Sequence, residues 1–198
     1  VYITTYGCQM NDHDTERMYS LLEMSNYSQA RTPDEADVII INSCSVREKP
    51  VHKVMSEIGT YRPLKQANPL LKIGVGGCVG QQEGDKLLKG PNGVDFVFGT
   101  DSIDLLPQIL DDIKSRKVKK GAWTSMQHRA PYEINTLVRN AKVSAFVTIT
   151  KGCDNFCSFC VVPFTRGREK SRKLSEIITD VQNLVKRGVK EVTLLGQN

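Results

Sequence analysis

The chain has 198 residues, of which 39% are hydrophobic and 25% are charged, a balance typical of a globular protein with one complete domain and part of another. It lacks any run of about eighteen apolar residues, and its opening VYITTYGCQMND does not resemble a signal peptide, so we expect neither a membrane span nor a secretory leader. We therefore expect a cytoplasmic protein. In that reducing compartment six cysteines indicate metal ligands or catalytic thiols rather than disulfides.

The net charge of +5 is unevenly distributed along the chain. Residues 1–113 carry 10 basic and 16 acidic groups, whereas residues 114–198 carry 17 basic and 6 acidic groups. A polyanionic partner that docks on the second part would explain this asymmetry. The run KSRKVKK at 114–120 fits a solvated helix end equally well, because cations are favoured there.

Strands and helices alternate along the first part of the chain, which predicts a parallel sheet covered by helices. The apolar run VIII at 38–41 is typical of a strand buried on both faces. In chain order we predict a strand at 1–6, a helix from Asn11 or Asp12 to about Met24, the strand 38–41, a helix at 48–59, a strand at 71–76, a short helix at 81–89, a strand at 94–98 and a helix from Ser102. These elements make a complete α/β domain with a doubly wound parallel sheet, which we assign to residues 1–120.

The remaining chain predicts a linker and the start of a second domain. Residues 121–140 lose the periodicity and are assigned to the linker. A strand at 143–150, a cysteine-rich loop, a helix from about Ser175 to Gly188 and a strand at 191–195 then make one βαβ unit. Because a single unit leaves its sheet edges uncovered, we predict that 141–198 begin a larger βα barrel that is truncated here.

Three cysteines lie just after successive predicted strands, namely Cys8, Cys44 and Cys78. Parallel strands end at the same edge of a sheet, where ligands bind in open α/β sheets, so we expect these thiols to converge. A single cysteine at such a position is more often a small buried hydrophobe. Three of them at the same topological position predict a shared metal or cluster site.

The other three cysteines lie in the segment TKGCDNFCSFCVVPFTRGR at 150–168, with C-x3-C-x2-C spacing at Cys153, Cys157 and Cys160. A structural zinc site uses four ligands, and the nearest histidine, His128, lies far upstream. A [4Fe–4S] cluster held by three thiolates would leave one iron without a protein ligand. That iron would be open to a substrate or a cofactor, as catalytic metal sites require.

This spacing, in a loop after the first strand of a βα unit, resembles the radical S-adenosylmethionine (SAM) superfamily. Five segments together resemble the radical SAM methylthiotransferases and are closest to the members that act on isopentenyladenosine next to the anticodon of tRNA: TYGCQMN, NSCSVRE, GGCVGQ, KGCDNFCSFCVVPFTRGREKSR and LLGQN. The resemblance covers essentially the whole chain and puts every cysteine in a family motif.

The resemblance implies two [4Fe–4S] clusters, a radical cluster on the second triad and an auxiliary cluster on the first. It also implies that the methionine part of SAM chelates the open iron of the radical cluster. In the implied reaction one SAM methylates a sulfur at the auxiliary cluster, and a second is cleaved to a 5′-deoxyadenosyl radical that removes hydrogen from carbon 2 of the adenine. No catalytic side chain is implied, because the protein positions cofactor against substrate.

The same resemblance implies further cofactor-binding residues. Phe159 matches the aromatic position that lies against the adenine of SAM, and Gln197 and Asn198 match a polar segment that contacts its amino group. Arg166 and Arg168 follow the cluster loop and are candidates for the SAM carboxylate or for RNA phosphate, although a solvated arginine is at least as common. The alternative for Gln197 and Asn198 is the start of a plain loop.

Two asparagines, Asn11 and Asn42, stand beside cysteines of the first triad. Their hydrogen bonds to cluster sulfur would tune its potential, and Asn11 fits a helix cap equally well.

The implied partners are the tRNA anticodon stem-loop, SAM and an electron donor such as flavodoxin or ferredoxin, without a membrane. The family's remaining barrel strands and its carboxyl-terminal RNA-binding domain are missing from this sequence, so we expect this part alone to be inactive. Three alternatives remain open. They are a methylthiotransferase acting on a ribosomal protein, one acting on another modified adenosine, and a non-catalytic RNA-binding module that holds zinc.

Overall fold

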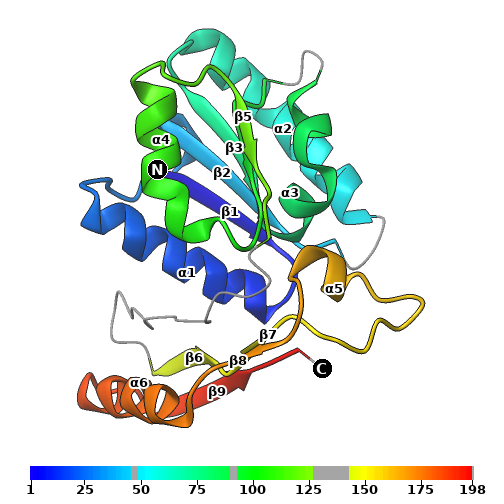
Figure 1. Cartoon of the computed structure of the whole chain (residues 1–198). Helices are drawn as coiled ribbons and strands as arrows, with labels where there is room; N and C mark the ends of the chain where they lie inside the picture. The colour runs from blue at the N-terminus through cyan, green and yellow to red at the C-terminus, as the bar shows by residue number, and fades with distance from the viewer. Residues whose placement is uncertain (46–48, 90–92, 127–142, 198) are drawn as a thin grey trace. The chain divides into compact units, whose positions relative to one another are not determined.

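The computed structural model describes residues 1–45, 49–89, 93–126 and 143–197, which belong to two compact units, Val1–Met126 and Gln127–Asn198 (Figure 1). Each unit has its own hydrophobic core. None of the helices in these described ranges is both long and apolar enough to cross a membrane.

The first unit is built on a parallel sheet of five strands. The strands are β1 (Tyr2–Tyr6), β2 (Val38–Ser43), β3 (Lys72–Gly76), β4 (Phe96–Phe98) and β5 (Gly121–Trp123), and they follow one another across the sheet in chain order. The strand order therefore never reverses, unlike that of many doubly wound sheets. In register, Ile41 pairs with Thr4 and with Val75. The carboxyl ends of β1, β2 and β3 consequently meet at one edge.

Helices cover both faces of this sheet, as the sequence predicts. They are α1 (Gln9–Met24), α2 (Lys49–Ala67), α3 (Gly77–Glu83) and α4 (Leu106–Lys114), with short 3-10 turns η1 (Pro33–Glu35), η2 (Gly84–Leu88) and η3 (Ile103–Leu105). Figure 1 shows α1 and α4 on one face and α2 and α3 on the other. Ile40 packs with the first pair, whereas Ile39 and Ile41 pack with the second. Because β2 is buried on both faces, its sequence is a continuous apolar run.

The predicted elements of this unit are present, although α1 begins at Gln9 and the helix predicted from Ser102 begins with the 3-10 turn η3. Three further differences are larger. The helix predicted at 48–59 continues to Ala67 through Pro63, and the helix predicted at 81–89 begins at Gly77 and changes to the 3-10 turn η2 at Gly84. Residues 121–123, predicted as linker, form the fifth strand instead. A three-residue strand is too short to show a periodicity, and it is fixed by backbone pairing, including the Gly99 amide that donates to the Trp123 carbonyl at 2.8 Å. The rest of the expected linker, from 127, lies outside the described residues.

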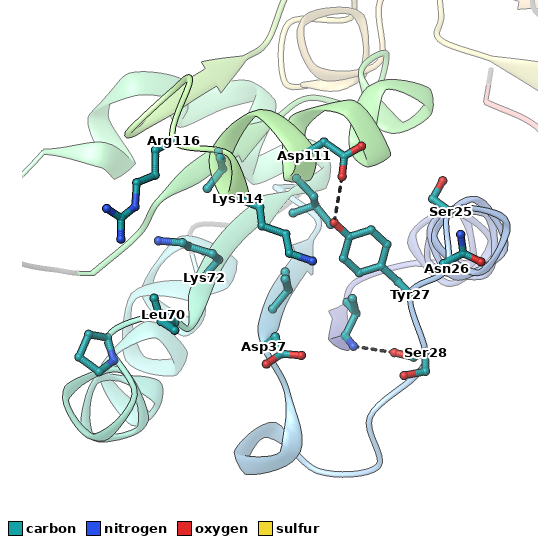
Figure 2. Close-up of a pocket in the computed structure, with 15 residues that line it drawn as sticks. Ser25, Asn26, Tyr27, Ser28, Asp37, Leu70, Lys72, Asp111, Lys114 and Arg116 are labelled. Atoms are coloured by element: carbon teal, nitrogen blue, oxygen red, sulfur yellow. Dashed lines mark hydrogen bonds between the residues drawn. The ribbon is translucent and has the colours of Figure 1, made fainter.

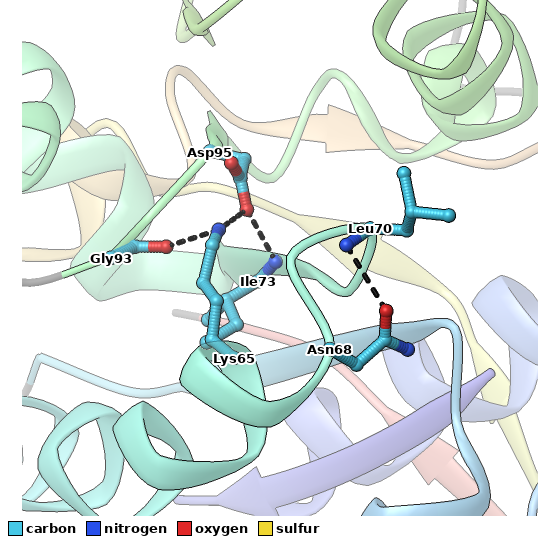
Figure 3. Close-up of polar contacts among 6 residues, drawn as sticks. All are labelled: Lys65, Asn68, Leu70, Ile73, Gly93 and Asp95. Carbon is cyan, nitrogen blue, oxygen red and sulfur yellow. Dashed lines mark hydrogen bonds and ion pairs between the residues drawn. The ribbon is translucent and has the colours of Figure 1, made fainter.

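A polar cluster connects α2 to the sheet at the edge where β3 and β4 begin (Figure 3). The Lys65 ammonium donates to the Asp95 carboxylate and, at 2.7 Å, to the Gly93 carbonyl, while the Ile73 amide donates to the same carboxylate at 2.8 Å. Burial lowers the pKa of Lys65, and the neighbouring Asp95 opposes that shift. Nearby, Asn68 Oδ1 accepts from the Leu70 amide at 3.1 Å in the turn before β3.

The second unit contains the predicted βαβ arrangement. Its strands β6 (Ser144–Thr148) and β9 (Glu191–Leu195) pair in parallel, and α6 (Leu174–Lys186) packs on them through Val147, Leu184 and Val189. The strand predicted at 143–150 ends at Thr148, because β7 (Thr150–Lys151) pairs separately, antiparallel to β8 (Lys170–Ser171). The short helix α5 (Val162–Thr165) follows the cysteine loop.

Candidate metal centres

The first cysteine triad lies at the carboxyl edge of β1, β2 and β3, as the sequence predicts. Cys8 immediately precedes α1, Cys44 follows β2, and Cys78 is the second residue of α3. The Cys44 amide donates to the Tyr6 carbonyl at 2.9 Å, which joins the turn after β2 to the end of β1. A backbone bridge between residues 43 and 77 joins it to the turn after β3. The three cysteine-bearing turns are therefore direct neighbours.

Two glycines with positive φ allow these turns to approach one another. Gly7 has φ +146°, and a Cβ at this position would lie 2.5 Å from the Cys44 Cβ. Gly77 has φ +78°, and a Cβ there would lie 2.3 Å from Asn42 Oδ1 and 2.7 Å from the Ser43 carbonyl oxygen. Any side chain would push the turns apart, so glycine is required at both positions.

A chain of buried hydrogen bonds runs beneath the first triad. Cys8 Sγ donates to Asn11 Oδ1 at 3.3 Å, and Asn11 Nδ2 donates to Asn42 Oδ1 at 3.3 Å. Asn42 Nδ2 donates in turn to the Asn11 carbonyl and to Thr15 Oγ1, both at 2.9 Å. The Thr15 hydroxyl meets that of Thr5 at 2.7 Å. The Cys8 amide donates to Asn11 Oδ1 at 3.5 Å in a capping box, in which Cys8 is the N-cap and Asn11 is the third residue of α1. The helix therefore begins before the predicted start at Asn11 or Asp12, because the turn after β1 is closed by Cys8.

Basic and aromatic groups lie near the same edge. The Lys53 ammonium stands 3.9 Å from the centre of the Tyr6 ring at the end of β1. Burial raises the pKa of Tyr6, so this phenol stays protonated at neutral pH. Glu57 also interacts with the Tyr6 phenol, so this flank of the triad carries both a positive and a negative side chain.

The second triad lies in the loop between β7 and α5. Cys153 is buried, Cys157 is exposed and Cys160 is partly exposed. The Cys153 amide donates to the Gly167 carbonyl at 3.2 Å, and the Cys160 amide donates to the Cys157 carbonyl at 2.9 Å. One end of the loop is therefore fixed inside the unit, while the other two thiols face outward.

Aromatic and charged side chains brace the outer part of this loop. Phe156, at φ +48°, meets the Phe164 ring edge-on at 5.9 Å between ring centres. The Arg168 guanidinium lies 4.5 Å from the centre of the Phe156 ring and 3.5 Å from the Asp154 carboxylate. These contacts hold the segment between Cys153 and Cys157 against the residues that follow α5.

The base of the loop is fastened to the end of β9. The Gly152 amide donates to Gln197 Oε1 at 2.8 Å, and the Gln197 amide donates to Thr150 Oγ1 at 3.1 Å. Gly152 has φ +79°, and a Cβ there would lie 2.2 Å from the Arg168 carbonyl oxygen. Gln197 therefore stands beside the cysteine loop, with its side chain engaged by the backbone. Asn198 and His128 lie outside the described residues.

The remaining predicted residues divide by exposure. Phe159 is 92% exposed and Arg168 is accessible, so both are available to a ligand. Arg166 is only 2% exposed, so it is not the solvated arginine that was the alternative to a contact with the SAM carboxylate or RNA phosphate. It ends α5, where its amide donates to the Val162 carbonyl at 2.8 Å, and its side chain is packed inside the unit.

Sequence reasoning missed a second buried arginine, Arg172. Its guanidinium donates to the Thr148 carbonyl at 3.1 Å and pairs with the Asp180 carboxylate at 2.7 Å. The weaker partner Glu176 lies at 3.9 Å. The available signal was the spacing of these acids, four and eight residues after Arg172, which places both on one side of α6.

The donor set suits iron–sulfur clusters, although the thiols are not yet gathered around a common point. All six cysteines carry reduced thiols, and thiolate is the usual protein ligand of such clusters. Within the described ranges, no three His, Cys, Asp or Glu side chains stand close enough to hold a metal ion as they are.

A cavity of about 700 Å³ lies at the opposite edge of the first sheet, where the strands begin (Figure 2). Val1, Val38 and Lys72 line it from the strands, and Lys114 and Arg116 line it from the end of α4. The Tyr27 hydroxyl donates to Asp111 at its rim at 3.4 Å. The cavity contains no cysteine and is far in the fold from the carboxyl edge, so it is not the candidate metal centre.

Comparison with protein families gives a match for each part of the chain. Residues 1–99 match the model described as uncharacterized protein family UPF0004, and residues 147–198 match that of the radical SAM superfamily. These two ranges contain all six cysteines.

Curated relatives match the chain along its whole length. The chain is 65% identical to a tRNA-2-methylthio-N(6)-dimethylallyladenosine synthase of Bdellovibrio bacteriovorus, covering 100% of this chain and 44% of that protein. Proteins of the same name from Syntrophus aciditrophicus and Myxococcus xanthus are 48% and 47% identical, again over 100% of this chain and 43% of theirs. The chain thus spans less than half the length of these relatives.

Solved structures are similar in fold. Two structures of the radical S-adenosylmethionine methyltransferase TsrM from Kitasatospora setae match with TM-scores of 0.62 and 0.64, at 12% and 10% identity. They cover 99% and 100% of this chain and 47% of TsrM. The TsrM structures hold, respectively, a tryptophan substrate with a SAM analogue, and cobalamin with a [4Fe–4S] cluster. At this identity the likeness supports the fold, an α/β domain followed by the beginning of a radical SAM fold.

Proposed function

The chain belongs to the UPF0004 family of radical SAM methylthiotransferases, and from this membership we propose that the full-length protein inserts a methylthio group at carbon 2 of isopentenyladenosine next to the anticodon of tRNA. The observation that carries the proposal is the 65% identity to a relative named for this modification, maintained over the whole chain. The location of the two cysteine triads on separate compact units supports it.

Each triad would hold one [4Fe–4S] cluster. Cys153, Cys157 and Cys160 would hold the radical cluster, and three thiolates would leave its fourth iron open for SAM. Cys8, Cys44 and Cys78 would hold the auxiliary cluster. When bound, the clusters and two SAM molecules would supply the sulfur, the methyl group and the radical that removes hydrogen from carbon 2.

The protein's own residues would position these groups. Gln197 would keep the base of the cysteine loop in place through the Gly152 amide, and its neighbour Asn198 would reach the amino group of SAM. Phe159, which is almost fully exposed, would cover the adenine of SAM once that cofactor is bound. Arg168, stacked on Phe156, would present its guanidinium to the SAM carboxylate or to an RNA phosphate.

The lysines after α4 would contribute to tRNA binding. Lys117, Lys119 and Lys120 are exposed and follow one another closely, so they can contact the phosphate backbone. Flavodoxin or ferredoxin would donate the electron for SAM cleavage. The modification takes place on tRNA, which puts the protein in the cytoplasm.

Anaerobic reconstitution of the full-length protein with iron and sulfide tests the proposal. We expect about eight irons per chain, SAM cleavage in the presence of a reductant, and a methylthio product on tRNA that already carries isopentenyladenosine. Unmodified tRNA and a ribosomal protein extract serve as comparison substrates. Binding of zinc without SAM cleavage would favour a non-catalytic RNA-binding module, and product on the ribosomal protein alone would favour that other branch of the family.

A further inference from the structure

We propose that Asn11 and Asn42 are positioning residues for the first triad, where their mutual hydrogen bonds hold the cysteine-bearing turns in place beside the ligand sulfurs. This inference rests on the proposed function, because it assumes that the triad binds a cluster. It concerns two side chains that are not themselves ligands.

Both amides are completely buried, which requires that their polar groups find partners inside the protein. Asn11 and Asn42 are each 0% exposed. A buried side-chain amide without hydrogen-bond partners would lower the stability of the folded protein by about 1–3 kcal/mol. The pair satisfies this requirement internally, through Asn11 Nδ2 to Asn42 Oδ1 and Asn42 Nδ2 to the Asn11 carbonyl. Apolar side chains could fill the same space without needing hydrogen-bond partners, so the polar pair indicates a role besides packing.

The pair lies among the turns that carry the cysteines. Asn11 Oδ1 faces the first turn, at 3.3 Å from Cys8 Sγ, and it lies 2.7 Å from the position of a Cβ on Gly7. The same Cβ position lies 2.5 Å from Cys44, in the second turn. Asn42 Oδ1 lies 2.3 Å from the Cβ position of Gly77, next to Cys78 in the third turn. The pair therefore lies against the first and third turns, and Asn42 itself stands in β2 two residues before Cys44.

A helix cap alone does not explain Asn11. An aspartate at this third helical position would accept from the Cys8 amide as an asparagine does, because the capping box uses only an oxygen acceptor there. The asparagine amide also provides an N–H donor, which it uses on Asn42. An aspartate at 11 would lose that donor and add a negative charge beside a ligand sulfur. Asn11→Asp thus keeps the cap and removes the proposed positioning role.

The test uses the full-length protein with Cys153, Cys157 and Cys160 changed to alanine, so that only the auxiliary cluster is observed after anaerobic reconstitution. In this background we compare Asn11→Asp with the parent by two measurements, the midpoint reduction potential and the rate of iron release to a chelator. We expect a more negative potential, because added negative charge disfavours the reduced cluster. We also expect iron release about 10–100-fold faster, the range typical of lost outer-shell contacts.

Asn68→Asp is the matched control, since Asn68 lies on the surface of the same unit and uses only its Oδ1, on the Leu70 amide. It should leave both measurements unchanged. If Asn11→Asp does not fold, the uncharged Asn11→Ser, whose shorter side chain lacks the amide donor to Asn42, should release iron faster at an almost unchanged potential. A potential and a release rate equal to those of the parent would overturn the inference. If the parent itself binds no cluster in this background, the proposed function fails instead.

Discussion

At the scale of single residues, the Lys65–Asp95 pair shows how a buried charge is held in this fold. The Lys65 side chain is 20% exposed and that of Asp95 is 9% exposed, so both charged groups are largely shielded from water. The buried carboxylate of Asp95 is stabilised because it accepts hydrogen bonds from Lys65 and from the Ile73 amide at the start of β3. Removal of one partner leaves the other charge without compensation.

We therefore predict that Lys65→Met lowers the free energy of unfolding by about 1–3 kcal/mol. The double variant Lys65→Met/Asp95→Asn should recover part of that loss, because an amide oxygen still accepts from Ile73 without carrying charge. Urea unfolding followed by the fluorescence of Trp123, the chain's single tryptophan and a residue of β5, reports on this unit. Equal losses in the single and double variants would mean that the ion pair is not the source of the effect.

A second residue-scale prediction concerns alkaline pH. Burial, followed by the hydrogen bond to Glu57 at 2.6 Å, raises the pKa of Tyr61 well above its ordinary value of 10.0. Above pH 10 the unfolded chain loses this phenol proton while the folded chain keeps it, so the free energy of unfolding falls as pH rises. Tyr61→Phe should be less stable by about 1 kcal/mol at pH 8, and this difference should shrink by pH 11. A difference that stays constant between pH 8 and pH 11 would contradict a raised pKa.

At the scale of elements, the second cysteine loop depends on one glycine at its base. Gly152 combines a positive φ with a Cβ position 2.2 Å from the Arg168 carbonyl oxygen, so a side chain there must displace the backbone on the other side of the loop. Gly188, after α6, has φ +92° with nothing within 4 Å of its Cβ position. Alanine substitutions at the two glycines therefore distinguish the effect of backbone strain, present at both, from the effect of a close contact, present only at Gly152.

We predict that Gly152→Ala prevents stable loading of the second triad, whereas Gly188→Ala causes only the strain of a left-handed alanine, about 1–2 kcal/mol. In the reconstituted full-length protein, the iron count should fall from about eight to about four for Gly152→Ala and stay near eight for Gly188→Ala. SAM cleavage should be lost in Gly152→Ala and retained in Gly188→Ala. Full iron content in Gly152→Ala would show that the loop tolerates the displacement.

At the scale of the whole molecule, the charge is divided less unevenly between the two compact units than the count for residues 1–113 and 114–198 indicates. The charge count above placed the run KSRKVKK with residues 114–198, whereas the first compact unit extends to Met126 and includes it. The first unit then carries 15 basic and 16 acidic groups, and the second carries 12 basic and 6 acidic groups. The basic run is consequently a local patch on a nearly neutral unit, and the expected phosphate contact Arg166 is buried.

For the whole enzyme we predict that Lys117, Lys119 and Lys120 bind tRNA phosphates. Their joint change to glutamine should weaken tRNA binding. It should also reduce the slope of log binding constant against log salt concentration by up to the contribution of about three neutralised phosphates. SAM cleavage in the absence of tRNA should not change. A matched triple change of exposed lysines elsewhere, Lys173, Lys186 and Lys190, is the control for general loss of charge. Identical salt slopes for the parent and the Lys117 triple variant would place the tRNA contact elsewhere.

The separation of the triads gives the last prediction at this scale. Because each triad lies within its own compact unit, alanine at Cys153, Cys157 and Cys160 should leave about four irons on the first triad. SAM cleavage should then be abolished. Cys44→Ala should instead retain SAM cleavage and lose methylthio transfer. Loss of all iron in the Cys153 triple variant would mean that the two sites do not load independently.

Much of this architecture was readable from the sequence, because it depends on local patterns. The alternation of strands and helices, the twice-buried strand at 38–41 and the placement of Cys8, Cys44 and Cys78 at strand ends are set by periodicity and chain order. The family was recognisable because its cysteine spacings and flanking residues are contiguous in sequence. Each of these features is decided by residues that are near one another along the chain.

Other features were decided only by tertiary structure, because they depend on groups far apart in sequence. Residues 121–123 form a strand through pairing with β4, and Arg166 is buried although an arginine is usually exposed. The contact between Asn11 and Asn42, 31 residues apart, exists only because β1 and β2 lie side by side in a register that brings their ends together. Periodicity reports which face of an element is buried, whereas the partner that meets each polar group is fixed by packing between elements.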